Sequence, residues 1–145
     1  MKKIIASFVL MSAVLTGCAS NSSMSCTFNV ETGDSIRVEL DTSGSDYKLK
    51  ADGSRFIINE EDTDVITGIF LTADMYDQYE SAISETGTIL ESDGYILYEY
   101  AGESGTERNI LLMVPDSETG IIMGSLADEE TVRDIYGRLS FTNEK

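Results

Sequence analysis

The sequence predicts an α+β fold: short, hairpin-connected strands forming an antiparallel sheet, with two helices at about 72–86 and 126–137 packed on it. Three observations predict it. Apolar and polar residues alternate over short runs, which indicates half-buried strands. Most of these runs are separated by brief Gly- and Asp-rich turns, too short for parallel crossovers. Two other stretches carry apolar residues at helical spacing.

Length and composition indicate one domain and exclude several functions. The chain has 145 residues, 41% of them hydrophobic, which suffices for a single core. Its formal net charge is −16, so its surface repels phosphate backbones and we expect no nucleic-acid partner. It contains no histidine. Ser-His-Asp triads, Cys-His pairs and histidine metal sites are therefore excluded.

The first seventeen residues have the proportions of a secretory signal peptide. Lys2 and Lys3 precede an apolar run over residues 4–14, which is shorter than the roughly 20 residues of a transmembrane helix. We therefore expect residues 1–17 to be removed. The two lysines leave with them, so the remaining body is more acidic still.

The next motif, Leu15-Thr16-Gly17-Cys18, resembles a bacterial lipobox. The resemblance implies cleavage after Gly17 and a diacylglycerol thioether on Cys18, whose acyl chains (palmitate) anchor the protein to the membrane. The domain would then face the extracytoplasmic side. A plain secretory signal followed by an incidental cysteine is the alternative.

After the lipidated cysteine we expect a polar tether, 18–26 in all, and then a single α+β domain over 27–145. A lipidated Cys18 cannot form a disulfide, so Cys26 would be a lone thiol. Its place beside a strand-like run predicts a small buried side chain rather than a reactive one.

The strands of the first half follow from alternation and turns. Ile36, Val38 and Leu40 alternate with polar residues, and Asp52-Gly53 is a tight hairpin signal. The expected strands are 27–30, 35–40, 47–51, 55–59 and 65–71, with a turn at 41–46 and an acidic loop at 60–64.

A helix interrupts the strands. Thr72 is a suitable N-cap, Asp74 complements the helix dipole and Gly87 is placed as a C′ stop. The apolar stripe expected to pack consists of Met75, Tyr79, Ala82 and Ile83. Further strands are expected at 88–90, 95–101, 109–114 and 120–124.

The last helix has the clearest pattern. Ser125 and Asp128 have capping-box spacing, and Gly137 is expected to end the helix before a closing segment at 138–141. The residues expected to be largely buried on it are Val132, Ile135 and Leu139, with Tyr136 on the same stripe.

Calcium is the one cofactor that the sequence makes worth weighing. Residues 41–46 and 59–64 cluster hard oxygen ligands, namely Asp41, Asp46, Glu60, Glu61, Asp62 and Asp64. Neither segment fits the helix–loop–helix calcium pattern, and acidic hairpin loops are typical of soluble surfaces. We therefore expect no metal and no cofactor. The candidate binding residues are Tyr76, Tyr98 and Tyr100. Tyr95, Tyr98 and Tyr100 lie on one expected strand and could line a contact surface on either face, although tyrosines of this kind more often serve core and cross-strand packing.

The chain resembles small lipoproteins of unknown function from Gram-positive gut bacteria. Besides the lipobox, the resemblance rests on Val65–Phe70 leading into Tyr76 and Tyr79, and on Gly120–Leu126 followed by Glu129-Glu130, Tyr136 and Leu139-Ser140-Phe141. About the last eighty residues also resemble the Mog1/PsbP-like α+β fold, through packing motifs. Neither resemblance implies a catalytic residue.

We therefore expect a membrane-anchored, monomeric binding or accessory module with a protein or cell-envelope partner, and not an enzyme. The alternative is a carboxylate-based or calcium-assisted hydrolase, or an enzyme subunit, at the cell surface. A pocket with convergent acidic groups would favour the enzyme, whereas a flat, tyrosine-bearing sheet face would favour the module.

Overall fold

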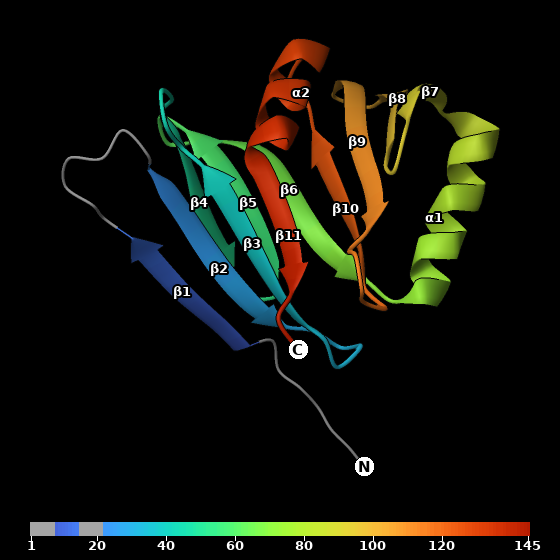
Figure 1. Ribbon diagram of the computed structural model, residues 1–145. Coiled ribbons are helices and arrows are strands. Elements are labelled where there is room, and N and C mark those ends of the chain that lie inside the picture. Colours follow the sequence, from blue (N-terminus) through green and yellow to red (C-terminus); the bar gives the residue numbers. More distant parts are fainter. Residues whose placement is uncertain (1–7, 15–21) are drawn as a thin grey trace.

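A computed structural model describes residues 8–14 and 22–145 (Figure 1). It confirms the α+β class, with antiparallel pairing between neighbouring strands. A four-stranded sheet has the order β1-β2-β3-β11 and a seven-stranded sheet the order β4-β5-β6-β10-β9-β8-β7. The first comprises β1 (Phe8–Val14), β2 (Ser23–Asn29), β3 (Ser35–Asp41) and β11 (Leu139–Asn143). The second comprises β4 (Tyr47–Asp52), β5 (Arg55–Glu60), β6 (Thr63–Leu71), β7 (Thr88–Ser92), β8 (Ile96–Gly102), β9 (Gly105–Met113) and β10 (Gly120–Ser125).

The main core lies between the two sheets, on what we call the inner face of the seven-stranded sheet. The expected alternation on β3 is confirmed, since Ile36, Val38 and Leu40 are all buried there. Phenylalanine rings meet at its centre, with the centroids of Phe28 and Phe70 4.9 Å apart. Gly68 on β6 lies under the Phe56 ring, which a Cβ at Gly68 would overlap. A glycine therefore makes room for the largest side chains of this core.

The helix α2 (Glu129–Arg138) continues the inner layer beyond the four-stranded sheet and buries Val132 and Ile135 as expected (Figure 1). Its start differs from the expected 126. Asp128 is the N-cap and accepts from the Thr131 amide at 2.8 Å. The Ser125 hydroxyl instead accepts from the Ala127 amide, which turns the chain before the helix begins.

The end of α2 also differs from the expectation, because Gly137 is inside the helix and does not end it. The Arg138 side chain stabilises the last turn through two hydrogen bonds. Its Nε donates to Asp134 Oδ2 at 3.2 Å, and its Nη1 donates to the Ser43 carbonyl at 2.8 Å. Leu139 then begins β11 directly and is half-buried, although we expected it on the buried stripe of the helix.

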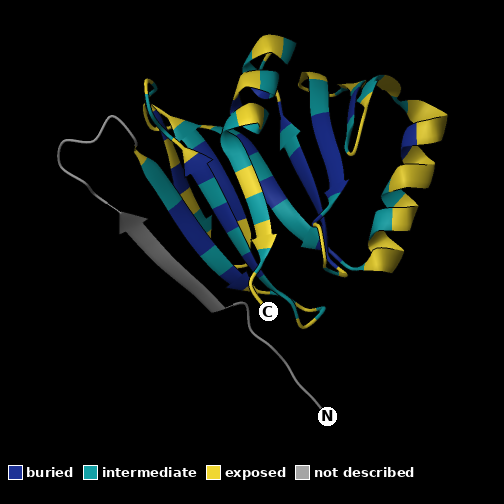
Figure 2. Cartoon of the chain, viewed as in Figure 1, coloured by how far each residue is buried: buried dark blue, intermediate teal, exposed yellow. Residues whose placement is uncertain are grey.

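The other helix, α1 (Ala73–Thr86), packs on the opposite, outer face of the seven-stranded sheet. Thr72 caps it as expected, and Ile83 is its buried residue; most of the helix is exposed (Figure 2). Met75 is exposed, and Tyr76 packs in its place. Gly87 is the C-cap in an extended conformation, not a left-handed one. It is needed because a Cβ there would lie 3.0 Å from the Tyr98 ring.

Several turns and the first strands refine the predicted boundaries. Gly53 has the positive φ that the Asp-Gly hairpin signal indicates. β2 begins at Ser23, so residues 23–26, expected in the tether, belong to the sheet. Cys26 is buried on β2 as a free thiol, as expected, and burial raises its pKa. The strand β1 pairs with β2 along Phe8–Val14, within the expected signal peptide.

Candidate functional site

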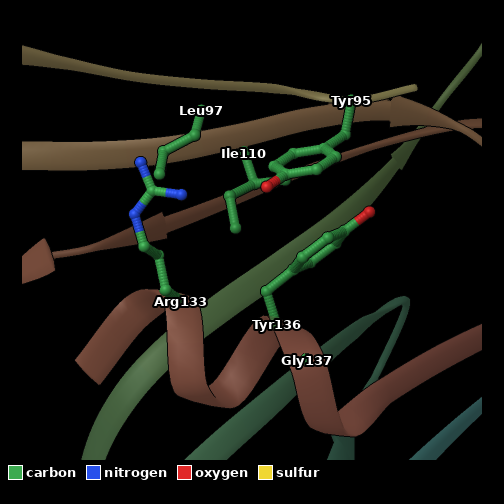
Figure 3. A pocket seen from close by; sticks show the side chains of 6 residues that line it. All are labelled: Tyr95, Leu97, Ile110, Arg133, Tyr136 and Gly137. Carbon is green, nitrogen blue, oxygen red and sulfur yellow. The ribbon is translucent and has the colours of Figure 1, made fainter. Parts of the chain in front are cut away.

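A pocket of about 280 Å³ opens between α2 and the inner face of β8 and β9 (Figure 3). The sheet supplies its floor through apolar side chains of the main core, and α2 supplies the opposite wall. Its size is close to the lower end of known ligand pockets. It is lined by Tyr95, Leu97, Ile110, Arg133, Tyr136 and Gly137.

Two aromatic rings form one side of this pocket. Tyr95 lies just before β8 and Tyr136 on α2, and their ring centroids are 4.4 Å apart at an interplanar angle of 38°. Burial, and secondarily the neighbouring Tyr95, raises the pKa of Tyr136, so this phenol is neutral at physiological pH. The two rings are thus packed against each other between β8 and α2, with a hydroxyl on each ring.

Arg133 supplies the charged group of the pocket. Its Nη1 donates to Glu91 Oε1 on β7 and its Nε donates to Glu129 Oε2 on α2, each at 2.8 Å. These bonds raise the pKa of the guanidinium, which stays protonated. Both carboxylates are partnered by one cation, so neither is a free base. The geometry suits binding of an uncharged ring or apolar group better than acid–base chemistry.

Gly137 borders the pocket on the helix side. A Cβ at this position would meet no atom of the described chain within 4 Å. Glycine costs a helix interior about 1 kcal/mol relative to alanine. No packing contact in the described chain accounts for that cost, and the missing methyl leaves the pocket wall open.

The binding candidates expected from sequence lie elsewhere, on the outer face. Tyr98 is 6% exposed and Tyr100 is 36% exposed, with ring centroids 6.3 Å apart and nearly parallel. Tyr76 packs on Gly120, where a Cβ would lie 2.9 Å from its ring. The structure thus brings Tyr98 and Tyr100 together on β8 and places Tyr76 apart from them, on α1. Cys18, the expected lipid attachment, lies outside the described residues.

Sequence reasoning did not assemble this pocket, whose residues come from distant parts of the chain. Tyr136 was expected only as part of a packing stripe. The contact of Arg133 with Glu91 joins residues 42 positions apart, which no local pattern indicates. An arginine next to the apolar stripe of a helix was the one available signal.

The acidic segments considered for calcium are held by other contacts. Asp41 is the last residue of β3 and accepts from the amide and hydroxyl of Ser43. Asp64 is in β6 and lies 3.8 Å from Lys50 Nζ. Glu61 and Asp62 form the tight turn between β5 and β6, both at positive φ. Within residues 22–145, no three carboxylate or thiol side chains are grouped to hold a metal ion.

Comparisons with known proteins give no identification. No protein-family model, curated protein or solved structure matches the chain. Among the described residues, neither α1 nor α2 has the length and apolar character needed to cross a membrane.

Proposed function

We propose that this protein is a lipid-anchored extracytoplasmic lipoprotein that acts as a binding or accessory module, with its ligand group in the α2 pocket. The observation that carries the proposal is the pairing of Tyr95 and Tyr136, 4.4 Å apart, at the wall of an open pocket. Concave apolar sites with a few polar groups are where proteins bind small ligands. Because Arg133 engages both nearby carboxylates, we favour binding over hydrolysis.

The chemistry of the lining defines the ligand group. Leu97 and Ile110 are buried and apolar, and the Tyr95 and Tyr136 rings are packed on each other at the pocket wall. Aromatic rings pack favourably on one another in offset or tilted arrangements. A neutral aromatic or apolar group, with a polar atom within reach of a phenol, is the ligand class that we infer.

The binding proposal is tested with indole and phenol as probes. We expect saturable NMR shifts of the Tyr136 and Gly137 amides in the wild type, and binding weakened about tenfold in Gly137→Ala, whose methyl narrows the pocket. Because alanine favours the helix, this variant should be more stable by about 1 kcal/mol. Ser84→Ala, an exposed position of α1, is the matched control and should bind normally. Absence of shifts at both amides would contradict the pocket assignment.

The anchor is tested separately. In a bacterial host with lipoprotein processing, Cys18→Ala should leave unprocessed precursor, and an inhibitor of lipoprotein signal peptidase should do the same to the wild type. Metabolic labelling with palmitate should mark the wild type but not the variant. A freely secreted protein whose N-terminus lies downstream of Cys18 would disprove lipidation.

A further inference from the structure

The strand β1 pairs with β2 at the outer edge of the four-stranded sheet (Figure 1). The pairing is antiparallel and runs without a register shift from Phe8↔Asn29 to Val14↔Ser23, so it covers the whole length of β2. Removal of residues 1–17, as proposed above, would take β1 away. The processed protein would then carry β2 as an edge strand, with a row of unpaired backbone N–H and C=O groups.

The other outer edges of the described sheets each have a feature that discourages pairing with a further strand. On β4, Lys48 and Lys50 are exposed. The register of β7 shifts between Ile89 and Glu91, and β11 has only five residues. Lysines, bulges and short length are usual protections of edge strands. By contrast, β2 has seven residues, and its sequence SMSCTFN contains neither a charged residue nor proline. Processing would therefore leave this edge unprotected.

The core-facing side of β2 defines what a replacement strand must bring. Cys26 and Phe28 are buried in the main core, Met24 packs against it, and β2 contacts β4 of the other sheet. Residues directly opposite each other in an antiparallel pair lie on the same face. Three alternate positions of an incoming strand, those opposite these residues, therefore face the core and call for apolar side chains.

Charge distinguishes a foreign strand from a second copy of this chain. The formal net charge is −16, and the loss of Lys2 and Lys3 with residues 1–17 makes it more negative. A large net charge keeps proteins monomeric, so repulsion opposes the pairing of two copies along β2. Residues 8–14 contain no charged residue. The segment that pairs with this edge in the structure is thus uncharged and apolar in sequence.

We propose that the processed protein binds an extended, uncharged apolar segment of a partner protein, which adds to the β2 edge as an antiparallel strand. In such β-augmentation, backbone hydrogen bonds provide affinity and alternate side chains provide specificity. This inference rests on the proposed removal of residues 1–17, and it does not involve the α2 pocket.

The probe is a synthetic peptide with the sequence of residues 8–14, flanked by lysines for solubility. Two proteins from the same bacterial host are compared: the processed wild type, purified from membranes in detergent, and the Cys18→Ala precursor, which keeps residues 1–17. We expect the peptide to bind the processed protein, to shift the NMR signals of the β2 amides and to slow their hydrogen exchange. The precursor should bind at least about tenfold more weakly, because β1 occupies the edge.

Two peptide variants of equal charge test which face of the strand meets the core. Position 11 is opposite Cys26, on the core side, and position 10 is opposite Thr27, on the other side. A peptide with Met11→Asp should bind at least about tenfold more weakly than the parent peptide, because its carboxylate would be buried. A peptide with Leu10→Asp should bind within about threefold of the parent. Equal losses for both variants would overturn the proposed register.

The intact mass of the purified wild type separates this proposal from the proposed anchor. A protein that keeps residues 1–17 would disprove both. If residues 1–17 are absent, a lack of peptide binding, or shifts confined to Tyr136 and Gly137, would overturn the strand proposal alone. A processed protein that sediments as a dimer and does not bind the peptide would show that a second copy occupies the edge, which also overturns it.

Discussion

The two faces of the seven-stranded sheet are built from different residues. The inner face packs phenylalanine and aliphatic side chains against the four-stranded sheet and α2. The outer face packs Leu71, Leu111 and Ile122 beneath α1, together with the tyrosines Tyr76, Tyr79 and Tyr98. The shorter helix buries two residues, Val132 and Ile135, whereas the longer one buries Ile83 alone.

This difference indicates that the two faces of the sheet contribute differently to stability. Close-packed aliphatic cores tolerate little change in volume, so the inner face should carry most of the stability. On the outer face the rings of Tyr76 and Tyr98 pack closely over Gly120 and Gly87, and Tyr76 is only half-buried. The candidate pocket lies beside α2, where a Cβ at Gly137 would meet no described atom within 4 Å.

The largest effect is expected from the inner face. Ile135→Ala should reduce the free energy of unfolding by about 2–5 kcal/mol, because a fully buried side chain leaves a cavity. Urea denaturation monitored by circular dichroism would measure it. A loss below about 0.5 kcal/mol would mean that α2 does not close the core, and the comparison of the faces would fail.

Gly68→Ala should cause the next largest loss in the free energy of unfolding. The added methyl overlaps the Phe56 ring at the centre of the phenylalanine cluster, so the ring must shift in a packed region. Overpacking of this kind costs about 1–3 kcal/mol. The double variant Gly68→Ala/Phe56→Leu should recover part of the loss, and no recovery would place the strain elsewhere than in this contact.

Gly120→Ala provides the matching change on the outer face. Its methyl would lie 2.9 Å from the ring of Tyr76, which is only half-buried on α1 and can tilt away. We expect a loss of about 1 kcal/mol or less in urea denaturation. A loss equal to that of Gly68→Ala would show that the outer face is packed as rigidly as the inner one.

The smallest effect at neutral pH is expected for Tyr98, whose ionisation changes the free energy of unfolding only at alkaline pH. Burial, and then the nearby Tyr100, Tyr79 and Glu107, raises its pKa from 10.0 to about 12. The folded state therefore binds this proton more tightly, and the resulting stability is complete below pH 10 and is lost as the pH rises toward 12. Tyr98→Phe should flatten the decline in unfolding free energy over that range. An unchanged slope would show that Tyr98 titrates normally.

The sequence predicted the elements better than their assembly. Alternation on β3 and the Asp52-Gly53 turn correctly located a strand and a hairpin, because these signals depend on neighbours in the chain. Division of the strands into two sheets depends on contacts between distant segments, such as β11 beside β3. No local pattern encodes those pairings.

The helix ends and the sites show the same limit. Gly137 was expected to end α2 because glycine usually ends helices, but Arg138 holds the last turn through the Ser43 carbonyl, far away in sequence. The aromatic pair of Tyr95 and Tyr136 likewise arises from a contact between elements that are distant in sequence. Tyr98 and Tyr100 do share the outer face, because alternate residues of one strand point to the same side.

The early start of β2 fixes how far the domain could stand from a bilayer. If the chain is anchored at Cys18, only Ala19 to Ser22 separate the anchor from the sheet. These residues form a linker that spans at most roughly 14 Å. Ser22 and Ser23 border a surface cavity with Arg138 and Asp41, so the β3–β4 turn and the C-terminal end of α2 lie beside the start of β2. In that case this end of the domain would face the membrane, and the short linker would restrict reorientation of the domain. The domain would therefore bind its ligands close to the membrane surface.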